Sequence, residues 1–189
     1  MAIKIFIDQG HNPVNPNAGA EANGVIEQDV NYEVGVRLAE LLNNNPNFEA
    51  RLSRNSPTEQ LGTSTLTSLQ ARTDGANNWG ADFFISLHAN ASNIVEASGS
   101  EAYVYMLESP AYYMATRILQ GLNYRTGLPN RGVMTNQRLY VLRNTDMPAV
   151  LVEMGYLTNP TDAYLLSTDP QSFAQGIYNG ILMYYGLMQ

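Results

Sequence analysis

The chain has 189 residues, 44% of them hydrophobic, which is enough to bury a continuous core without disulfides. Its net charge is −7 and only 14% of its residues are charged, so no excess of Lys or Arg is available to bind nucleic acid. The absence of cysteine excludes thiolate metal ligands and cysteine nucleophiles. No apolar stretch approaches the roughly 20 residues of a membrane-spanning helix. From the chain length and hydrophobic content, we expect one globular domain over residues 1–189.

The first predicted element is a buried strand from Ile3 to Ile7, which ends in a turn rich in Gly, Asn and Pro. His11 lies in that turn, just past the end of the strand. Apolar residues then recur at helical spacing from Val30 to Leu42 and predict an amphipathic helix, which ends at the breaker Asn43 to Pro46. Glu27 lies immediately before this helix.

The middle of the chain continues the alternation of strands and helices. A short strand is predicted from Phe48 to Ser53, followed by a polar loop from Thr58 to Ser68. A helical stretch from about Leu69 to Trp79 leads into the almost wholly apolar run Phe83 to Leu87, which is typical of a central strand. His88 follows directly at the end of that run.

The chain after His88 contains three further predicted strands. Glu101 to Met106 alternates as a strand, and Ala111 to Thr126 carries the apolar face of a helix. The apolar segments Leu139 to Leu142 and Ala149 to Val152 are also predicted to be strands. The second of these segments delivers Glu153 at its end.

Helical spacing from Phe173 to Tyr184 predicts a closing helix. Because parallel strands need crossover connections, the alternation predicts a three-layer α/β/α fold with a twisted, mostly parallel central sheet of about six strands. Ligands in such folds gather beyond the carboxyl ends of the strands, and His11, His88 and Glu153 all follow predicted strands. We therefore expect these three side chains to meet at one edge of the sheet.

His11 and His88 are the only two histidines in the chain. Neutral imidazole is a good zinc ligand, and a catalytic zinc ion commonly takes three protein ligands and leaves one position open. Glu27 can supply the third ligand. The residues alone leave a second interpretation open, in which each histidine is an ordinary turn or surface residue with a satisfied hydrogen bond.

Four blocks of sequence carry a more specific signal. They are Ile5 to His11, a strand followed by Asp-Gln-Gly-His; Gly24 to Asn31, a Glu that leads into a helix; Arg72 with Ala81 to Asn90, which contains Ser-Leu-His-Ala-Asn; and Pro148 to Asn159. Their order and spacing resemble those of the zinc-dependent N-acetylmuramoyl-L-alanine amidases of the amidase 3 family. The resemblance covers nearly the whole chain, and the third block is its most specific part.

The resemblance implies that one Zn²⁺ ion per chain is held by His11, Glu27 and His88, and that Glu153 is the catalytic carboxylate. It implies hydrolysis of the amide bond between N-acetylmuramic acid and L-alanine, so the partner is bacterial peptidoglycan or a muropeptide. Glu153 is then expected to take a proton from the attacking water and to pass it to the leaving nitrogen. Autolysins, sporulation or germination enzymes and phage endolysins of this family share the activity. We expect a monomer.

The first loop departs from the family pattern, because Gln9 replaces the usual Pro and Asn12-Pro13 replaces a Gly-rich continuation. This loop is expected to have its own shape. Glu21 is an alternative oxygen ligand, but Glu27 is preferred because the first-turn amides and dipole of a helix hold a carboxylate just ahead of it. The alternative for Glu153 is an N-cap or a solvated turn residue.

Three other residues are weaker candidates for the site. Asn90 and Arg72 are predicted either to orient His88 or to bind substrate, since zinc-bound histidines need a partner on the other ring nitrogen. Arg143 is predicted to contact a carboxylate of the stem peptide by a bidentate pair. An ordinary structural or surface role is an equally good interpretation of each.

Two other functions remain open: a zinc peptidase that cuts within the stem peptide, and a non-catalytic module that binds wall fragments. A phosphate-binding domain is disfavoured, because the chain has no glycine-rich phosphate loop. We expect the protein to act in the cell wall or the extracellular or periplasmic space. Met1 leads almost directly into the first strand without the features of a signal peptide, so we expect export by another route or by a signal outside this sequence.

Overall fold

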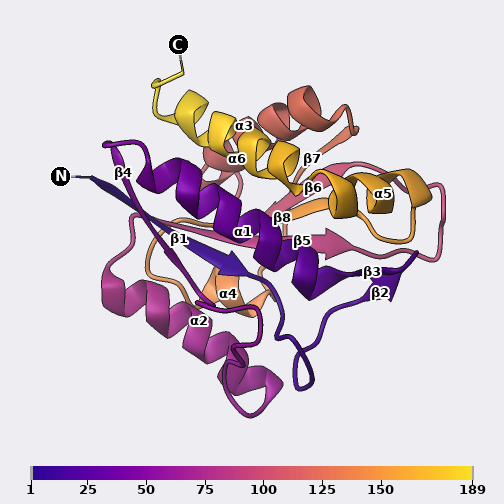
Figure 1. Ribbon diagram of the computed structural model, residues 1–189. Coiled ribbons are helices and arrows are strands. Elements are labelled where there is room, and N and C mark those ends of the chain that lie inside the picture. Colours follow the sequence, from indigo (N-terminus) through magenta and orange to yellow (C-terminus); the bar gives the residue numbers. More distant parts are fainter. Residues whose placement is uncertain (1, 189) are drawn as a thin grey trace.

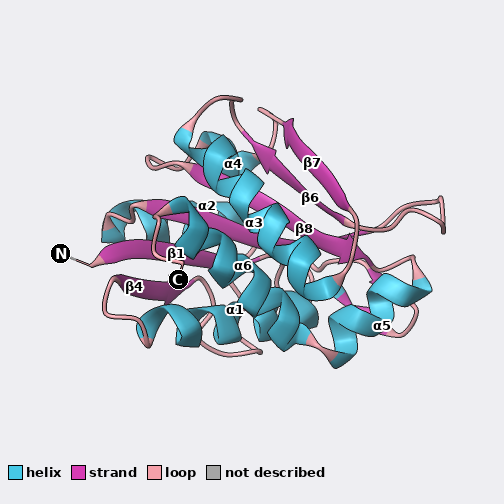
Figure 2. Ribbon diagram, turned by 90° about the horizontal axis from the view of Figure 1, so that it is seen from above, coloured by secondary structure: helices cyan, strands magenta, loops and turns pink. Residues whose placement is uncertain are grey.

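The apolar strand segments form one six-stranded sheet in the computed structural model of the protein, which describes residues 2–188. The order across the sheet is β4-β1-β5-β8-β6-β7, and Figure 2 shows these strands side by side. The first four are parallel, whereas β6 and β7 run antiparallel to β8. The strands are β1 (Ile3–Gln9), β4 (Phe48–Leu52), β5 (Phe83–Asn90), β6 (Ser100–Val104), β7 (Asn130–Thr135) and β8 (Ala149–Tyr156).

Helices cover both faces of the sheet (Figure 1). One face is packed under α1 (Glu27–Asn43), α3 (Pro110–Thr126), α5 (Pro160–Thr168) and α6 (Pro170–Tyr184). The other is packed against α2 (Thr65–Trp79) and the single turn α4 (Tyr140–Arg143). The expected three-layer α/β/α fold with a mostly parallel sheet is therefore confirmed.

Alternation along the strands decides which side chains can form a site. In β5, Ile85 and Leu87 lie in the larger core beneath α1, α3 and α6. Phe84 lies on the opposite face, in the smaller core shared with Phe6 and α2. Because side chains alternate with a period of two, His88 continues the face of Phe84. The site therefore opens on the α2 and α4 side of the sheet.

Two sequence expectations about this face are wrong. The segment Leu139 to Leu142 is not a strand, because its residues form the helical turn α4, in which Val141 and Leu142 are buried against the sheet. A run of four apolar residues is too short to distinguish the period of a strand from that of a helix. The helix expected from Leu69 begins one turn earlier, inside the predicted polar loop, because Ser64 and Thr67 form a capping box.

Four elements were not predicted from the sequence: β7, α5, and the two strands of a small hairpin, β2 (Glu21–Ala22) and β3 (Val25–Ile26). The other predicted elements agree with the structure within two residues at most ends. The main exception is the Ala149 segment, since β8 continues to Tyr156 and so contains Glu153. His88 likewise lies inside β5 and not after it. Across residues 2–188, none of the helices has the length and apolarity that crossing a bilayer requires.

A buried ion pair lies below the site. Asp8 and Arg72 are each 1% exposed, and Arg72 Nη1 is 2.6 Å from Asp8 Oδ1. Ser86 donates a second hydrogen bond to the carboxylate, at 2.7 Å. Burial opposes ionisation, but the charge of Arg72 and these hydrogen bonds hold the pKa of Asp8 below its usual value. The pair ties α2 to the carboxyl ends of β1 and β5.

Replacement of Arg72 by Met should lower the free energy of unfolding by about 3–5 kcal/mol, because the Asp8 carboxylate stays buried without its partner. Since the pair lowers the pKa of Asp8, it stabilises the fold above the unfolded pKa, and this contribution is lost as pH falls through the folded pKa. The difference between the two proteins should therefore be larger at pH 7 than at pH 4. Urea unfolding at both pH values measures it.

Arg37 provides the matched control, since it pairs with Glu33 on the exposed side of α1. Arg37→Met should cost less than about 1 kcal/mol, as is typical of surface pairs. Equal losses in the two variants, or a loss at Arg72 that does not depend on pH, would contradict the assignment.

Candidate metal centre and active site

His11 is presented by the tight turn that follows β1. Its backbone φ is 69°, an uncommon value for a residue with a side chain, and Arg72 Nη2 donates to its carbonyl oxygen at 2.6 Å. The ring atom Nδ1 lies 3.3 Å from the carbonyl oxygen of Asn17. Nδ1 can donate a proton to that carbonyl, so Nε2, which lies beside Glu27 Oε1, is the ring atom that faces the candidate metal position.

His88 is held close to the same turn. Its ring packs directly on Gly10, where an added Cβ atom would lie 2.4 Å from His88 Nε2. Only glycine therefore fits at this position. The Nδ1 atom of His88 lies 3.0 Å from Glu27 Oε1, and the two histidine rings meet edge to face with their centroids 4.8 Å apart.

Glu27 is the first residue of α1, and its carboxylate lies between the two histidines. Its Oε1 atom is 3.1 Å from His11 Nε2, and its Oε2 atom accepts a hydrogen bond from the backbone N–H of Ala20 at 2.9 Å. Burial opposes ionisation, but hydrogen bonds from His11 and His88 hold the pKa of Glu27 well below its usual value. Glu21 is exposed in β2 and is not part of this group.

These three side chains match the donor set of a zinc site. One ligand atom from each of His11, Glu27 and His88 lies within 4.8 Å of the other two. Two imidazole nitrogens and one carboxylate oxygen are a common set for catalytic zinc, which keeps a further position open. The turn after β1, the start of α1 and the end of β5 together bring the set to one point.

Glu153 lies beside this group on β8. It is paired in register with His88, so the two side chains lie on the same face of neighbouring strands. Its Oε2 atom is shielded from solvent and has no hydrogen-bond partner within residues 2–188. Burial and the negative charges of Glu27 and Glu101 raise the pKa of Glu153 to about 8. Because Glu153 lies inside a strand, it is neither an N-cap nor a turn residue.

A second carboxylate, Glu101, lies opposite Glu153 on the antiparallel strand β6. Its Oε1 atom accepts hydrogen bonds from Asn90 Nδ2 at 3.0 Å and from the hydroxyl of Tyr103 at 2.9 Å. Asn90 therefore contacts Glu101 and makes no hydrogen bond to His88 within the described chain. Burial opposes ionisation, but its hydrogen-bond donors hold the pKa of Glu101 below its usual value.

A small pocket beside the histidines has a volume of about 140 Å³, and Tyr140 and Val141 of α4 form part of its wall. Arg72 also lines it, but its guanidinium contacts Asp8 and the backbone of the His11 turn and makes no hydrogen bond to His88. Arg143 lines a different pocket, with Pro148 and Ala149 at the start of β8. The structure thus does not bring Arg143 to the histidine group.

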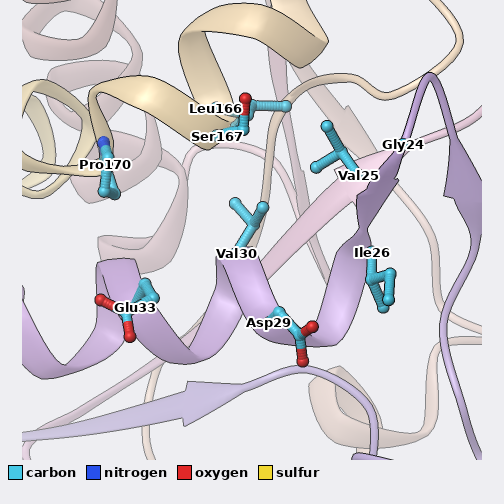
Figure 3. Close-up of a pocket in the computed structure, with 9 residues that line it drawn as sticks. All are labelled: Gly24, Val25, Ile26, Asp29, Val30, Glu33, Leu166, Ser167 and Pro170. Carbon is cyan, nitrogen blue, oxygen red and sulfur yellow. The ribbon is translucent and has the colours of Figure 1, made fainter.

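A further pocket, of about 250 Å³, lies between β3, α1 and α5. Figure 3 shows Val25 and Val30 directed towards Leu166 across it. Its lining includes the carboxylates of Asp29 and Glu33 and no histidine. It is therefore separate from the group formed by His11, Glu27 and His88.

Sequence reasoning missed several residues that shape the site. The carbonyl of Asn17 and the bare face of Gly10 act through the backbone, so their side chains give no direct signal. Glu101 was read only as part of a strand. A charged residue at the start of an otherwise apolar strand was the available signal for it, since buried charges need partners.

Comparison with known proteins points to one family. The family model of the N-acetylmuramoyl-L-alanine amidases matches residues 5–183. The chain is 36% identical to the N-acetylmuramoyl-L-alanine amidase CwlM of Bacillus licheniformis, over 98% of this chain and 70% of that protein. It is 34% identical to the sporulation-specific N-acetylmuramoyl-L-alanine amidase of Bacillus subtilis, over 98% and 69%. Among solved structures, the catalytic domain of CwlV from Bacillus (Paenibacillus) polymyxa superposes with a TM-score of 0.85 at 30% identity, over 98% of this chain and 99% of that one.

Proposed function

The chain belongs to the N-acetylmuramoyl-L-alanine amidase family, and on that premise we propose that His11, Glu27 and His88 hold its catalytic zinc ion and that Glu153 is its general base. Members of this family hydrolyse the amide that joins N-acetylmuramic acid to L-alanine in peptidoglycan. The observation that carries the assignment of residues is the convergence of three donor atoms within 4.8 Å beside Glu153, whose Oε2 atom is shielded from solvent and has no hydrogen-bond partner within residues 2–188.

A zinc ion bound by this set supplies Lewis acidity, which polarises the carbonyl group of the amide and lowers the pKa of water. Glu153 Oε2 lies ready to accept a proton, because no group of the described chain occupies it. Its raised pKa of about 8 suits both steps, since the carboxylate takes the proton of the attacking water and then gives it to the leaving nitrogen of L-alanine. Glu101 keeps its own charge and adds to the basicity of Glu153.

The monomer is the proposed active unit, because one chain supplies all three ligands and the base. The proposed place of action is the bacterial cell wall, where peptidoglycan lies. With a net charge of −7 the protein is not drawn to anionic wall polymers, so recognition must come from local contacts at the site.

Digestion of a defined muropeptide, followed by mass spectrometry, tests the proposal. The zinc-loaded protein should release intact glycan and a stem peptide with a free amino-terminal alanine. Removal of the metal with a chelator should abolish the cleavage, and added zinc should restore it.

Two results would contradict the proposal and indicate another function. Cleavage inside the stem peptide would indicate a zinc peptidase that uses the same metal group. Binding of the muropeptide by zinc-loaded protein without any cleavage would indicate a non-catalytic module.

A further inference from the structure

A row of polar side chains extends from the proposed metal ligands to the far edge of the sheet. His88, Glu153 and Glu101 occupy paired positions on β5, β8 and β6, so their side chains share one face. Strand β7 lies next to β6 (Figure 2), and Arg131 on β7 donates from Nε to Glu101 Oε2 at 2.8 Å. At about 4.8 Å per strand, β7 lies about 10 Å beyond the strand of Glu153.

Glu101 acts as a fixed anchor and not as a second base. Besides Asn90 and Tyr103, it accepts hydrogen bonds from Arg131 and from the hydroxyl of Tyr156 at 2.9 Å, so both carboxylate oxygens are used twice. Only 5% of its side chain is exposed. A buried carboxylate with four donors stays ionised and holds those donors in place.

Arg131 is held in one orientation, but not all of its hydrogen-bond donors are used. Its guanidinium lies 5.2 Å from the centre of the Tyr156 ring, and its side chain is 41% exposed. Nε is used by Glu101, and Nη1 has only a long contact of 3.4 Å with the carbonyl oxygen of Ser98. Within residues 2–188, Nη2 has no hydrogen-bond partner. Since arginine offers five N–H donors in a rigid fork, the outer edge of this group is available to an acceptor.

The backbone of β7 is irregular next to Arg131. The pairing of β6 with β7 shifts register between Ser100 and Ala102, where β7 contains one extra residue. Gly132 takes up the shift with a φ of 90°, a value that favours glycine. Bulges of this kind re-aim side chains beside active sites, which is consistent with the contact of Arg131 across to Glu101.

We propose that Arg131, oriented by Glu101, binds a carboxylate of the substrate's stem peptide, two to three residues beyond the amide that is cut. The inference rests on the proposed function. An extended peptide advances about 3.3–3.6 Å per residue, so about 10 Å corresponds to roughly three residues. Without Arg131, the carboxylates of Glu153 and Glu101 would repel an anionic stem. Arg143, the other candidate for this role, is the last residue of the turn α4 and lines a different pocket.

Two muropeptides test the proposal: one with free carboxylates at the second and third stem residues, and one with both converted to carboxamides. We expect zinc-loaded wild type to cut the first with the higher kcat/KM. Arg131→Gln should lower kcat/KM on the carboxylate substrate about tenfold, mainly through KM, and should lower it far less on the carboxamide. Arg131→Lys keeps the charge but not the planar fork of N–H donors. Its kcat/KM on the carboxylate substrate should lie between those of wild type and Arg131→Gln.

Arg125→Gln is the matched control, since Arg125 is exposed on α3, on the opposite face of the sheet. It should behave as wild type on both substrates. Glu101→Gln should reduce the preference for the carboxylate, because Arg131 loses its anchor.

Equal losses of Arg131→Gln on the two substrates would indicate a merely structural role and overturn the inference. The inference would also be overturned if Arg131→Gln kept the full preference of wild type for the carboxylate substrate over the carboxamide. Both results leave the proposed function standing, because wild type still cuts. If zinc-loaded wild type cuts neither muropeptide, the proposed function fails and the inference fails with it.

Discussion

Replacement of Glu153 by Gln is expected to lower kcat by about a thousandfold while zinc stays bound, because general acid–base catalysis typically contributes 10²- to 10⁴-fold. Gln has the same shape as Glu but cannot take the proton of the attacking water. No hydrogen bond within the described chain depends on Glu153 Oε2, so the exchange should leave the fold intact. Initial rates on a defined muropeptide and metal analysis of the purified variant measure the two quantities.

Glu40→Gln is the control for that experiment, because Glu40 is an exposed glutamate on α1 and the substitution is chemically the same. Its kcat should match that of wild type. If Glu153→Gln keeps more than about a tenth of the wild-type kcat with zinc bound, Glu153 is not the base and another group must accept the proton.

The carboxylates with oxygen atoms shielded from solvent differ in a way that supports this role. Asp8, Glu27, Glu101 and Asp162 all accept hydrogen bonds from the protein, whereas Glu153 Oε2 has no partner within residues 2–188. A buried polar atom without a partner destabilises the fold, so it is retained where a ligand or substrate completes it. Burial and the negative charges of Glu27 and Glu101 raise the pKa of Glu153 to about 8, so this group can exchange protons near neutral pH.

The sequence predicted the layers of the fold and the meeting of His11, His88 and Glu153 for an identifiable reason. The strands that contain or precede these residues are long apolar runs, and parallel strands place their carboxyl ends at one edge. Two histidines in the whole chain then left few ways to build a metal group.

The other features of the site depend on contacts that a single sequence does not specify. That Glu101 faces Glu153 follows from the antiparallel direction of β6, and alternation alone gives no strand direction. The contact of Arg131 with Glu101 lies beside the register shift at Gly132, in a strand that was not predicted from the sequence. Arg143 was a weaker candidate in a segment predicted to be a strand, and that segment is the turn α4.

Glu27→Gln should weaken zinc binding by about 100-fold or more, whereas Glu21→Gln should leave it unchanged. Loss of a residue that merely supports a zinc ligand already costs about 10- to 100-fold, and loss of a ligand's charge should cost at least as much. The pair is closely matched, since both glutamates lie in the segment before or at the start of α1, one buried between the histidines and one exposed in β2. Competition with a chromogenic chelator measures both affinities.

The same pair of variants has a second readout, because a metal that binds the folded chain stabilises it. Zinc at about 100 times its Kd should add about 2.7 kcal/mol to the free energy of unfolding of wild type and of Glu21→Gln, and much less to that of Glu27→Gln. The opposite pattern, with zinc lost from Glu21→Gln and kept by Glu27→Gln, would move the oxygen ligand to the β2 hairpin. It would also require the hairpin to fold over the histidines when metal binds, since Glu21 is exposed and outside the group in this structure.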